Sequence, residues 1–229
     1  MTHLAYDQNI VVDLEFTPSI RNARKHGVRQ VYEVIEIGSV RVSPDGCALD
    51  EFRCLVKPEM ATSVSGKVCR LTGITTHMLE DAPRFAEALL LFSEWVGKER
   101  TRMVAWSEND KAQIVSECAM KGIEVPANMH RWMDLQRVFP RAMDMRGRRK
   151  RMSLHDAFAW FDRELSGDCG HQALADAEHT AELLVALIKG EHLEHKRALE
   201  AAMTNGQPCG YNPMASALAG LLEKMNEAA

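Results

Sequence analysis

The order of strand-like and helix-like segments predicts an α/β fold, a mixed sheet with helices on both faces. Two observations carry this prediction. Three strand-like segments come before any convincing helix, which indicates an antiparallel start to the sheet. Two shorter strand-like segments then alternate with helical ones. The 229 residues are enough for one domain with a full core and an appendage.

The predicted strands are runs of β-branched and apolar residues. Five are expected, at residues 9–16, 29–42, 49–56, 103–106 and 132–135. The first reads NIVVDLEF, with acids at alternate positions near its end. Between the second and third, Pro44-Asp45-Gly46 is a turn signal, so these two strands form a hairpin.

The predicted helices show apolar residues at helical spacing. They are expected from residue 83 to about 96, at 110–121, from 153 to about 165 and at 173–189, with a loop or short helical turn at 71–75. Ser153 is an N-cap, and Gly122 and Gly190 are stop signals. We therefore expect one domain over residues 1–190 and a helical C-terminal extension over 191–229, which packs on the domain or forms a homodimer contact.

Composition excludes several other classes of protein. The net charge of −4 gives no global attraction for nucleic acid, so any phosphate-binding surface must be local. The six cysteines form no C-x-x-C pair, which excludes a zinc site of close pairs and favours reduced thiols in a cytoplasmic protein. The N-terminus is not of the secretory type, and no apolar run reaches the roughly 20 residues of a membrane span.

Acidic residues recur at three places where strands end or helices begin. Asp13 and Glu15 are two apart on a strand, so their carboxylates share one face, and like charges there call for a compensating cation. Taken alone, a solvated acidic strand end is equally compatible with this pair. Asp110 follows a strand and opens a helix, where an acid is commonly only a cap. His171 lies five residues before Asp176, in the first turn of an alanine- and leucine-rich helix.

In this order the acids resemble the motifs of the DEDDh exonucleases, a branch of the RNase H-like superfamily. The resemblance covers about residues 9–190 and implies a five-stranded RNase H-like sheet. The Leu71-Thr72-Gly73-Ile74-Thr75 segment is most similar to the Eri-type and KapD-type branch, and RNase T and polymerase proofreading subunits are more distant. Asp110 is matched to the second motif by the helix after it, with Glu108 as the alternative.

The resemblance implies a catalytic set of Asp13, Glu15, Asp110, His171 and Asp176. Its four acids would hold two Mg²⁺ or Mn²⁺ ions, and His171 would be the general base. It also implies a 3′→5′ exonuclease that releases nucleoside monophosphates from single-stranded ends, with RNA favoured. A DNA-directed or oligonucleotide-trimming enzyme stays open, as does a nucleic-acid-binding adaptor on an inactive nuclease fold.

Nucleic-acid contacts are expected near the first motif and in a basic run. By the resemblance, the backbone around Leu14, Phe16 and Thr17 contacts the terminal 3′-OH. Phe16 or Leu71 would wedge or stack the last bases, although core burial is the simpler interpretation for both, and Thr72 completes this nucleic-acid-binding set. Residues 137–151 hold seven cations and one acid, and we expect a basic loop that guides the backbone, with Arg148, Arg149 and Lys150 at its centre. A solvated loop is the alternative.

Overall fold

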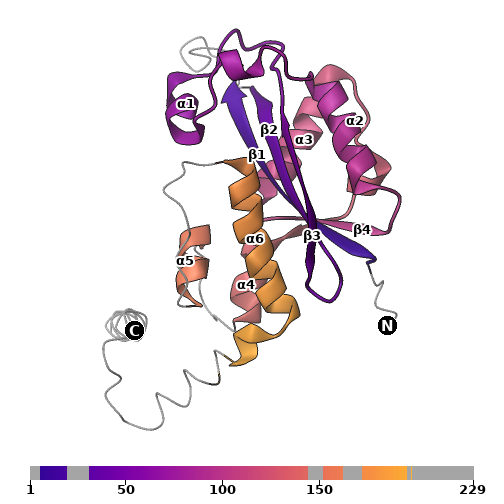
Figure 1. Cartoon of the computed structure of the whole chain (residues 1–229), viewed down its shortest axis with the longest axis vertical. Coiled ribbons are helices and arrows are strands. Elements are labelled where there is room, and N and C mark those ends of the chain that lie inside the picture. Colours follow the sequence, from indigo (N-terminus) through magenta and orange to yellow (C-terminus); the bar gives the residue numbers. More distant parts are fainter. Residues whose placement is uncertain (1–5, 20–30, 144–151, 162–171, 195–196, 198–229) are drawn as a thin grey trace.

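The computed structural model describes residues 6–19, 31–143, 152–161, 172–194 and 197. Its centre is a five-stranded sheet in the order β3-β2-β1-β4-β5 (Figure 1). The strands are β1 (Gln8–Pro18), β2 (Tyr32–Val42), β3 (Ala48–Leu55), β4 (Thr101–Ala105) and β5 (Trp132–Asp134). The first three pair antiparallel, whereas β4 runs parallel to β1 and β5 parallel to β4. The sheet is therefore mixed, as its sequence order predicted.

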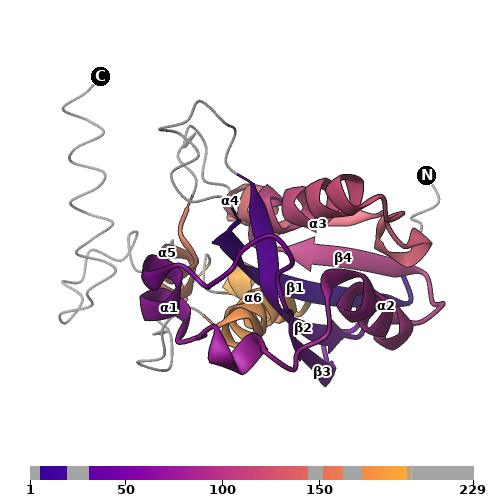
Figure 2. The ribbon, with the colours of Figure 1, turned by 90° about the horizontal axis from the view of Figure 1, so that it is seen from above.

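Helices cover both faces of this sheet (Figures 1 and 2). On one face lie α2 (Phe85–Val96) and α3 (Glu108–Lys121), and on the other lie α4 (Leu135–Ala142), α5 (Leu154–Ala159) and α6 (Ala173–Ile188). The short elements are α1 (Gly66–Thr72) and the 3-10 turns η2 (His77–Leu79) and η3 (Ala127–Met129). No helix among the described residues is long and apolar enough to cross a bilayer.

The side chains of β1 alternate between the two faces of the sheet, so that the strand contributes to two cores and its acids share one face. Ile10, Val12 and Leu14 point to the face of α2 and α3, where they are buried with the aromatic rings of α2. Val11 points to the other face and is buried with Leu184 and its neighbours on α6. Because side chains alternate along a strand, Asp13 and Glu15 share the face of Val11 and α6.

A β-bulge interrupts the pairing of β1 with β2 directly after the acids. Glu15 faces Glu36, but the next residue, Phe16, faces Val34, so Ile35 is the extra residue of β2. Its side chain is fully buried in a small third core with residues of the segment around α1, namely Val64, Ile74 and Leu79. The bulge thus lets one strand supply both a main core and this third core.

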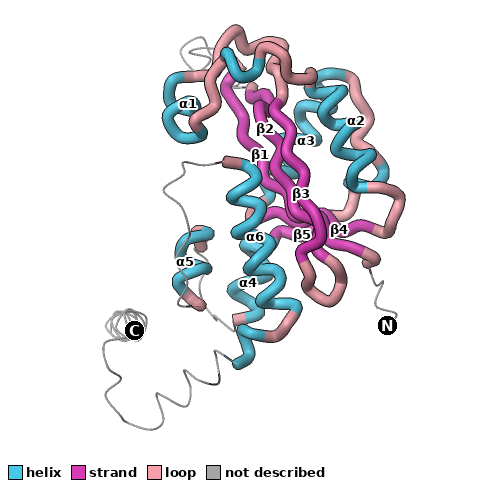
Figure 3. Tube along the Cα trace, in the orientation of Figure 1, coloured by secondary structure: helices cyan, strands magenta, loops and turns pink. Residues whose placement is uncertain are grey.

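The fold class is confirmed, and the strand and helix predictions differ from the structure mainly in two places. Figure 3 shows helix at α1 and α4, and the sequence predicted neither as a full helix. The prediction of one basic loop over residues 137–151 is wrong at its start, because Arg137 and Arg141 belong to α4. Residues 144–151 and 198–229 lie outside the described residues, so the C-terminal extension and its homodimer contact stay predictions, as does the domain boundary at residue 190.

Candidate active site

Three carboxylates meet where β1 passes the start of α6. Asp13 and Glu15 extend from β1, and Asp176 lies in the first turn of α6. Each offers an oxygen within 4.8 Å of the others; each residue as a whole keeps some exposed surface, whereas the carboxyl groups of Asp13 and Glu15 are largely buried. The two-residue spacing on the strand and the first-turn position on the helix, both read from the sequence, bring these groups together.

Asp110 reaches the same strand from the opposite side. It lies in the first turn of α3, is only 5% exposed, and its Oδ1 accepts a hydrogen bond from the Leu14 N–H at 3.2 Å. Glu108, the alternative candidate, is exposed and its Oε1 lies 2.6 Å from Nη1 of Arg137. The backbone of β1 thus holds Asp110 beside Asp13, whereas Glu108 points to α4.

Burial and mutual repulsion raise the pKa of three of these carboxyl groups. For Asp13, burial is the largest cause, followed by the charges of Asp110 and Asp176, and its pKa lies well above the ordinary value. Burial and then the charge of Asp176 raise the pKa of Glu15 from 4.5 to about 8. Burial also raises the pKa of Asp110 to about 7, although the Leu14 N–H partly opposes the shift. Without a compensating cation, the cluster therefore keeps part of its protons at neutral pH instead of carrying its full negative charge.

This donor set fits hard divalent cations. Carboxylate oxygens are the ligands that Mg²⁺ and Mn²⁺ prefer, and here they converge from β1 and α6, with Asp110 adjacent on α3. A bound cation would favour the ionised form of each carboxyl group and so reverse the pKa shifts that the acids impose on one another.

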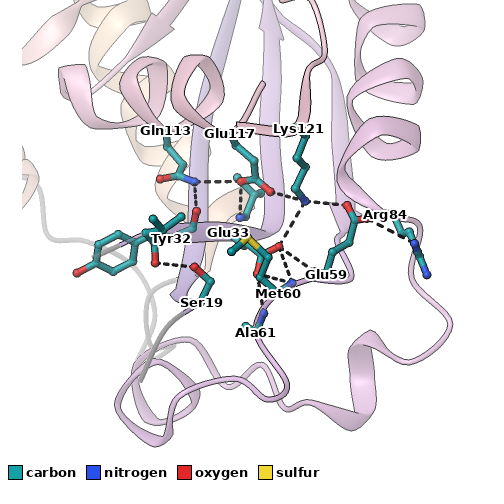
Figure 4. A network of polar contacts seen from close by, with 12 residues as sticks. Ser19, Tyr32, Glu33, Glu59, Met60, Ala61, Arg84, Gln113, Glu117 and Lys121 are labelled. Atoms are coloured by element: carbon teal, nitrogen blue, oxygen red, sulfur yellow. Dashed lines mark hydrogen bonds and ion pairs between the residues drawn. The ribbon is translucent and has the colours of Figure 1, made fainter. Parts of the chain in front are cut away.

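A buried polar network fixes α3, and with it Asp110, against the start of β2 (Figure 4). Glu117 of α3 accepts a hydrogen bond from the Val34 N–H at 2.8 Å and another from Gln113 Nε2 at 3.0 Å. Gln113 also donates to the Tyr32 carbonyl at 2.9 Å. Val34 is the residue next to the bulge, so Glu117 satisfies a backbone donor at the point where β2 leaves regular pairing.

The same network continues into the loop after β3. Glu33 is fully buried and accepts backbone N–H bonds from Glu59, Met60 and Ala61 at 2.7–3.1 Å. Lys121 Nζ lies 2.9 Å from Glu117, 2.8 Å from Glu59 and 3.4 Å from Glu33 (Figure 4). One lysine therefore joins three glutamates from α3, β2 and the loop, which fixes the position of these elements relative to one another.

Glu36 is an acidic neighbour of the cluster that the sequence predictions missed. It lies on β2 directly opposite Glu15, is fully buried, and its charge contributes to the raised pKa of both Asp13 and Glu15. The signal in the sequence is an acid between apolar residues of a strand, in the run Val34-Ile35-Glu36-Ile37. Such a position calls for a partner inside the fold.

The predicted nucleic-acid contacts fall into three groups. Leu14, Thr17 and Thr72 are buried, and Thr17 Oγ1 accepts a hydrogen bond from the Ser65 N–H at 3.1 Å. Phe16 is partly buried with its ring edge-on to Tyr32 at 5.6 Å, and Leu71 of α1 is 43% exposed. The third group, Arg148, Arg149 and Lys150, lies outside the described residues, as does the predicted general base His171.

Comparison with known proteins gives one consistent result. The RNase T exonuclease family model matches residues 10–184. Over 189 residues the chain is 31% identical to a DNA polymerase III PolC-type protein of Bacillus cereus, covering 81% of this chain and 12% of that protein. Over 171 residues it is 27% identical to ERI1 exoribonuclease 2 of Danio rerio, covering 65% of this chain and 30% of that protein. The chain thus spans a minor part of these two relatives.

The fold gives a matching result. The crystallographic structure of the nuclease domain of 3′hExo, described as a DEDDh family member bound to rAMP, superimposes with a TM-score of 0.71 at 21% identity. The match covers 82% of this chain and 95% of that domain, so the likeness extends over nearly the whole nuclease fold. Because the family model matches most of its length, this chain belongs to the RNase T exonuclease family, and its fold is that of the DEDDh nuclease domain just described.

Proposed function

We propose that this protein is a metal-dependent 3′→5′ exonuclease that releases nucleoside monophosphates from single-stranded nucleic acid, with RNA favoured. The observation that carries the proposal is the convergence of Asp13, Glu15 and Asp176 within 4.8 Å, with Asp110 held beside them by the Leu14 backbone. Membership of the exonuclease family supports the reaction class. The names of two relatives, an exoribonuclease and a nuclease domain bound to rAMP, support RNA.

In the proposed mechanism each side chain has a separate role. Asp13, Glu15 and Asp176 would hold one Mg²⁺ or Mn²⁺ ion, and Asp13 and Asp110 would help to hold a second. When bound, such ions activate the attacking water and stabilise the leaving 3′-oxygen. His171 would remove the proton from that water, for which its imidazole must be neutral.

Substrate binding is proposed to use the end of β1, α1 and the basic run. Phe16 and Leu71 retain exposed surface and would contact the terminal bases, Phe16 by stacking, which tolerates any base, and Leu71 as an apolar wedge. Leu14, Thr17 and Thr72 are buried, so we assign them the support of this surface. Arg148, Arg149 and Lys150 would bind phosphates without reading sequence.

The test uses one 20-nucleotide sequence made as RNA and as DNA, labelled at either end, with Mg²⁺, Mn²⁺ or excess EDTA. A 3′→5′ exonuclease releases a labelled mononucleotide at once from the 3′-labelled strand and a ladder from the 5′-labelled strand. The matched control is Asp13→Asn, which removes one charge and keeps the side-chain volume. Full turnover in EDTA, or by the Asp13→Asn protein, would contradict the proposal.

The second candidate is a DNA-directed 3′→5′ exonuclease, favoured by the 31% identity to a DNA polymerase III protein. Faster cleavage of the DNA strand than of the matched RNA strand would select it. The distinction depends on contacts to the 2′-hydroxyl. A non-enzymatic adaptor would bind both strands and release no nucleotide with either metal.

A further inference from the structure

Glu36 is a buried carboxylate with both oxygens engaged. Its side chain is fully buried in the middle of β2, Oε2 accepts the Ala173 N–H at 3.0 Å, and Oε1 accepts Arg53 Nε of β3 at 2.6 Å. Burying a carboxylate directly opposite Glu15 is unfavourable unless it makes strong bonds in return. One of these bonds joins β2 to the first residue of α6, and the other joins β2 to β3.

The N-terminus of α6 depends on this bond. The first N–H groups of a helix have no partner within the helix and are usually satisfied by the side chain of the N-cap residue. Here the N-cap residue, Gln172, makes no such bond. Glu36 therefore caps the helix from a neighbouring strand, and its negative charge lies at the positive end of the helix dipole.

Gly38, two residues further along β2, brings the same turn of α6 against the sheet. It lies opposite Asp13, and a Cβ at this position would clash with the backbone of Ala173 and Leu174. Only glycine leaves room for the helix backbone to approach the strand so closely. The start of α6 is thus fixed by a bond at Glu36 and by direct packing at Gly38.

We propose that Glu36 is a positioning residue of the active site: by capping α6 from β2, it sets where Asp176 meets Asp13 and Glu15. Asp176 is three residues after Ala173, in the same turn of α6 that Glu36 holds. A shift of this turn would move one of the three converging oxygens away from the other two. The metal-related part of this inference rests on the proposed function, whereas the capping contact does not.

The bonds of Glu36 argue against a role as a further metal ligand. Each of its oxygens already has a partner, and the three carboxylates that converge within 4.8 Å do not include it. Its reach to Ala173, rather than its charge, is therefore the property on which the site depends. Length and charge can be separated by substitution.

The experiment compares Glu36→Gln with Glu36→Asp, both in an Arg53→Met background, with Arg53→Met alone as the reference. The Arg53 side chain is 47% exposed. Its replacement by methionine prevents the side-chain NH₂ of a glutamine at position 36 from facing the guanidinium, where two donors would meet. Glutamine keeps the length and loses the charge; aspartate keeps the charge and withdraws the oxygens by about 1.5 Å. The readouts are hydrogen exchange at the Ala173 amide and Mn²⁺ affinity by calorimetry.

With Glu36→Gln we expect both readouts to stay within a few-fold of the reference. With Glu36→Asp we expect Ala173 exchange to be faster and Mn²⁺ affinity weaker, each by roughly 10- to 100-fold. Unchanged values for Glu36→Asp, or equal losses for both variants, would overturn the proposal. If Glu36→Asp fails to fold, Glu36→Met in the same background keeps the side-chain length and removes the acceptor, and unaltered Ala173 exchange and Mn²⁺ affinity there would overturn it.

The test of Glu36 and the test of the exonuclease activity can fail independently. A wild-type protein that binds Mn²⁺ but releases no nucleotide would refute the exonuclease and leave both readouts intact. A wild-type protein that binds no Mn²⁺ would also refute the exonuclease, and Ala173 exchange in the two variants would then decide the capping role alone.

Discussion

Replacing Asp110 with asparagine should change how the stability of the metal-free protein depends on pH. The pKa of Asp110 in the folded protein is about 7, against an ordinary value of 3.8. Between these values the folded state keeps a proton that the unfolded state has released. The free energy of unfolding therefore falls as pH rises through this window, by about 1.4 kcal/mol per pH unit, and the whole penalty is present above pH 7.

The magnitude follows from the part of the window that the assay covers. From pH 5.5 to pH 8, about 1.5 units lie below the folded pKa, so Asp110 should lower the free energy of unfolding by about 2 kcal/mol. Asparagine cannot ionise, and its carbonyl oxygen can still accept the Leu14 N–H. The variant should therefore lack this contribution. Loss of the Asp110 charge should also lower the pKa of Asp13 and Glu15, which acts in the same direction.

The assay is urea unfolding of both proteins in EDTA at pH 5.5 and pH 8. The expected result is a difference between wild type and Asp110→Asn that shifts by about 2 kcal/mol in favour of the variant on going to pH 8. Mg²⁺ at pH 8 should stabilise the wild type more than the variant, because the cation binds the folded carboxylates. An identical difference at both pH values would refute the reasoning.

Three further outcomes are expected. His171→Ala should lower the rate of nucleotide release by roughly 10²- to 10⁴-fold while Mn²⁺ affinity by calorimetry is largely retained, and a parallel loss of both would show a role in metal binding instead. Glu117→Ala should lower the free energy of urea unfolding by about 3 kcal/mol, because it leaves Lys121 and the Val34 N–H with one partner fewer. The control Glu94→Ala, at an exposed position, should change that free energy by less than about 0.5 kcal/mol. Equal effects of the two substitutions would contradict the role assigned to Glu117. Replacing residues 148–150 with serine should weaken RNA binding and flatten its dependence on salt in fluorescence titrations, and an unchanged slope would show that these residues do not contact the backbone.

Local rules placed each acid on its element, and the resemblance to the DEDDh exonucleases grouped the acids into one predicted set. Alternation along a strand places Asp13 and Glu15 on one face, and the helix register identifies Asp110 and Asp176 as first-turn residues. These rules need no knowledge of distant contacts. They could not show that Asp110 binds the Leu14 backbone, because that bond joins residues 96 positions apart.

The missed features depend on contacts between distant segments. Glu36 can accept the Ala173 N–H only once α6 lies on β2, whereas the sequence shows merely an acid in an apolar strand. The helix α4 contains Pro140, which normally argues against a helix, and its sequence also carries Arg137 and Arg141. Its position is fixed by burial of Leu135 and Phe139 against the sheet, which overrides local propensity.

The extra residue Ile35 lets the segment around α1 pack on the sheet apart from the acidic site. Its side chain belongs to the third core, so the segment around α1 contacts the sheet through a small apolar cluster of its own, together with the hydrogen bond from Ser65 to Thr17. The acids before the bulge belong to regular pairing and do not depend on that contact. Under the proposed function, exchange of this segment for one of different length or surface would change substrate preference and leave the acids in place.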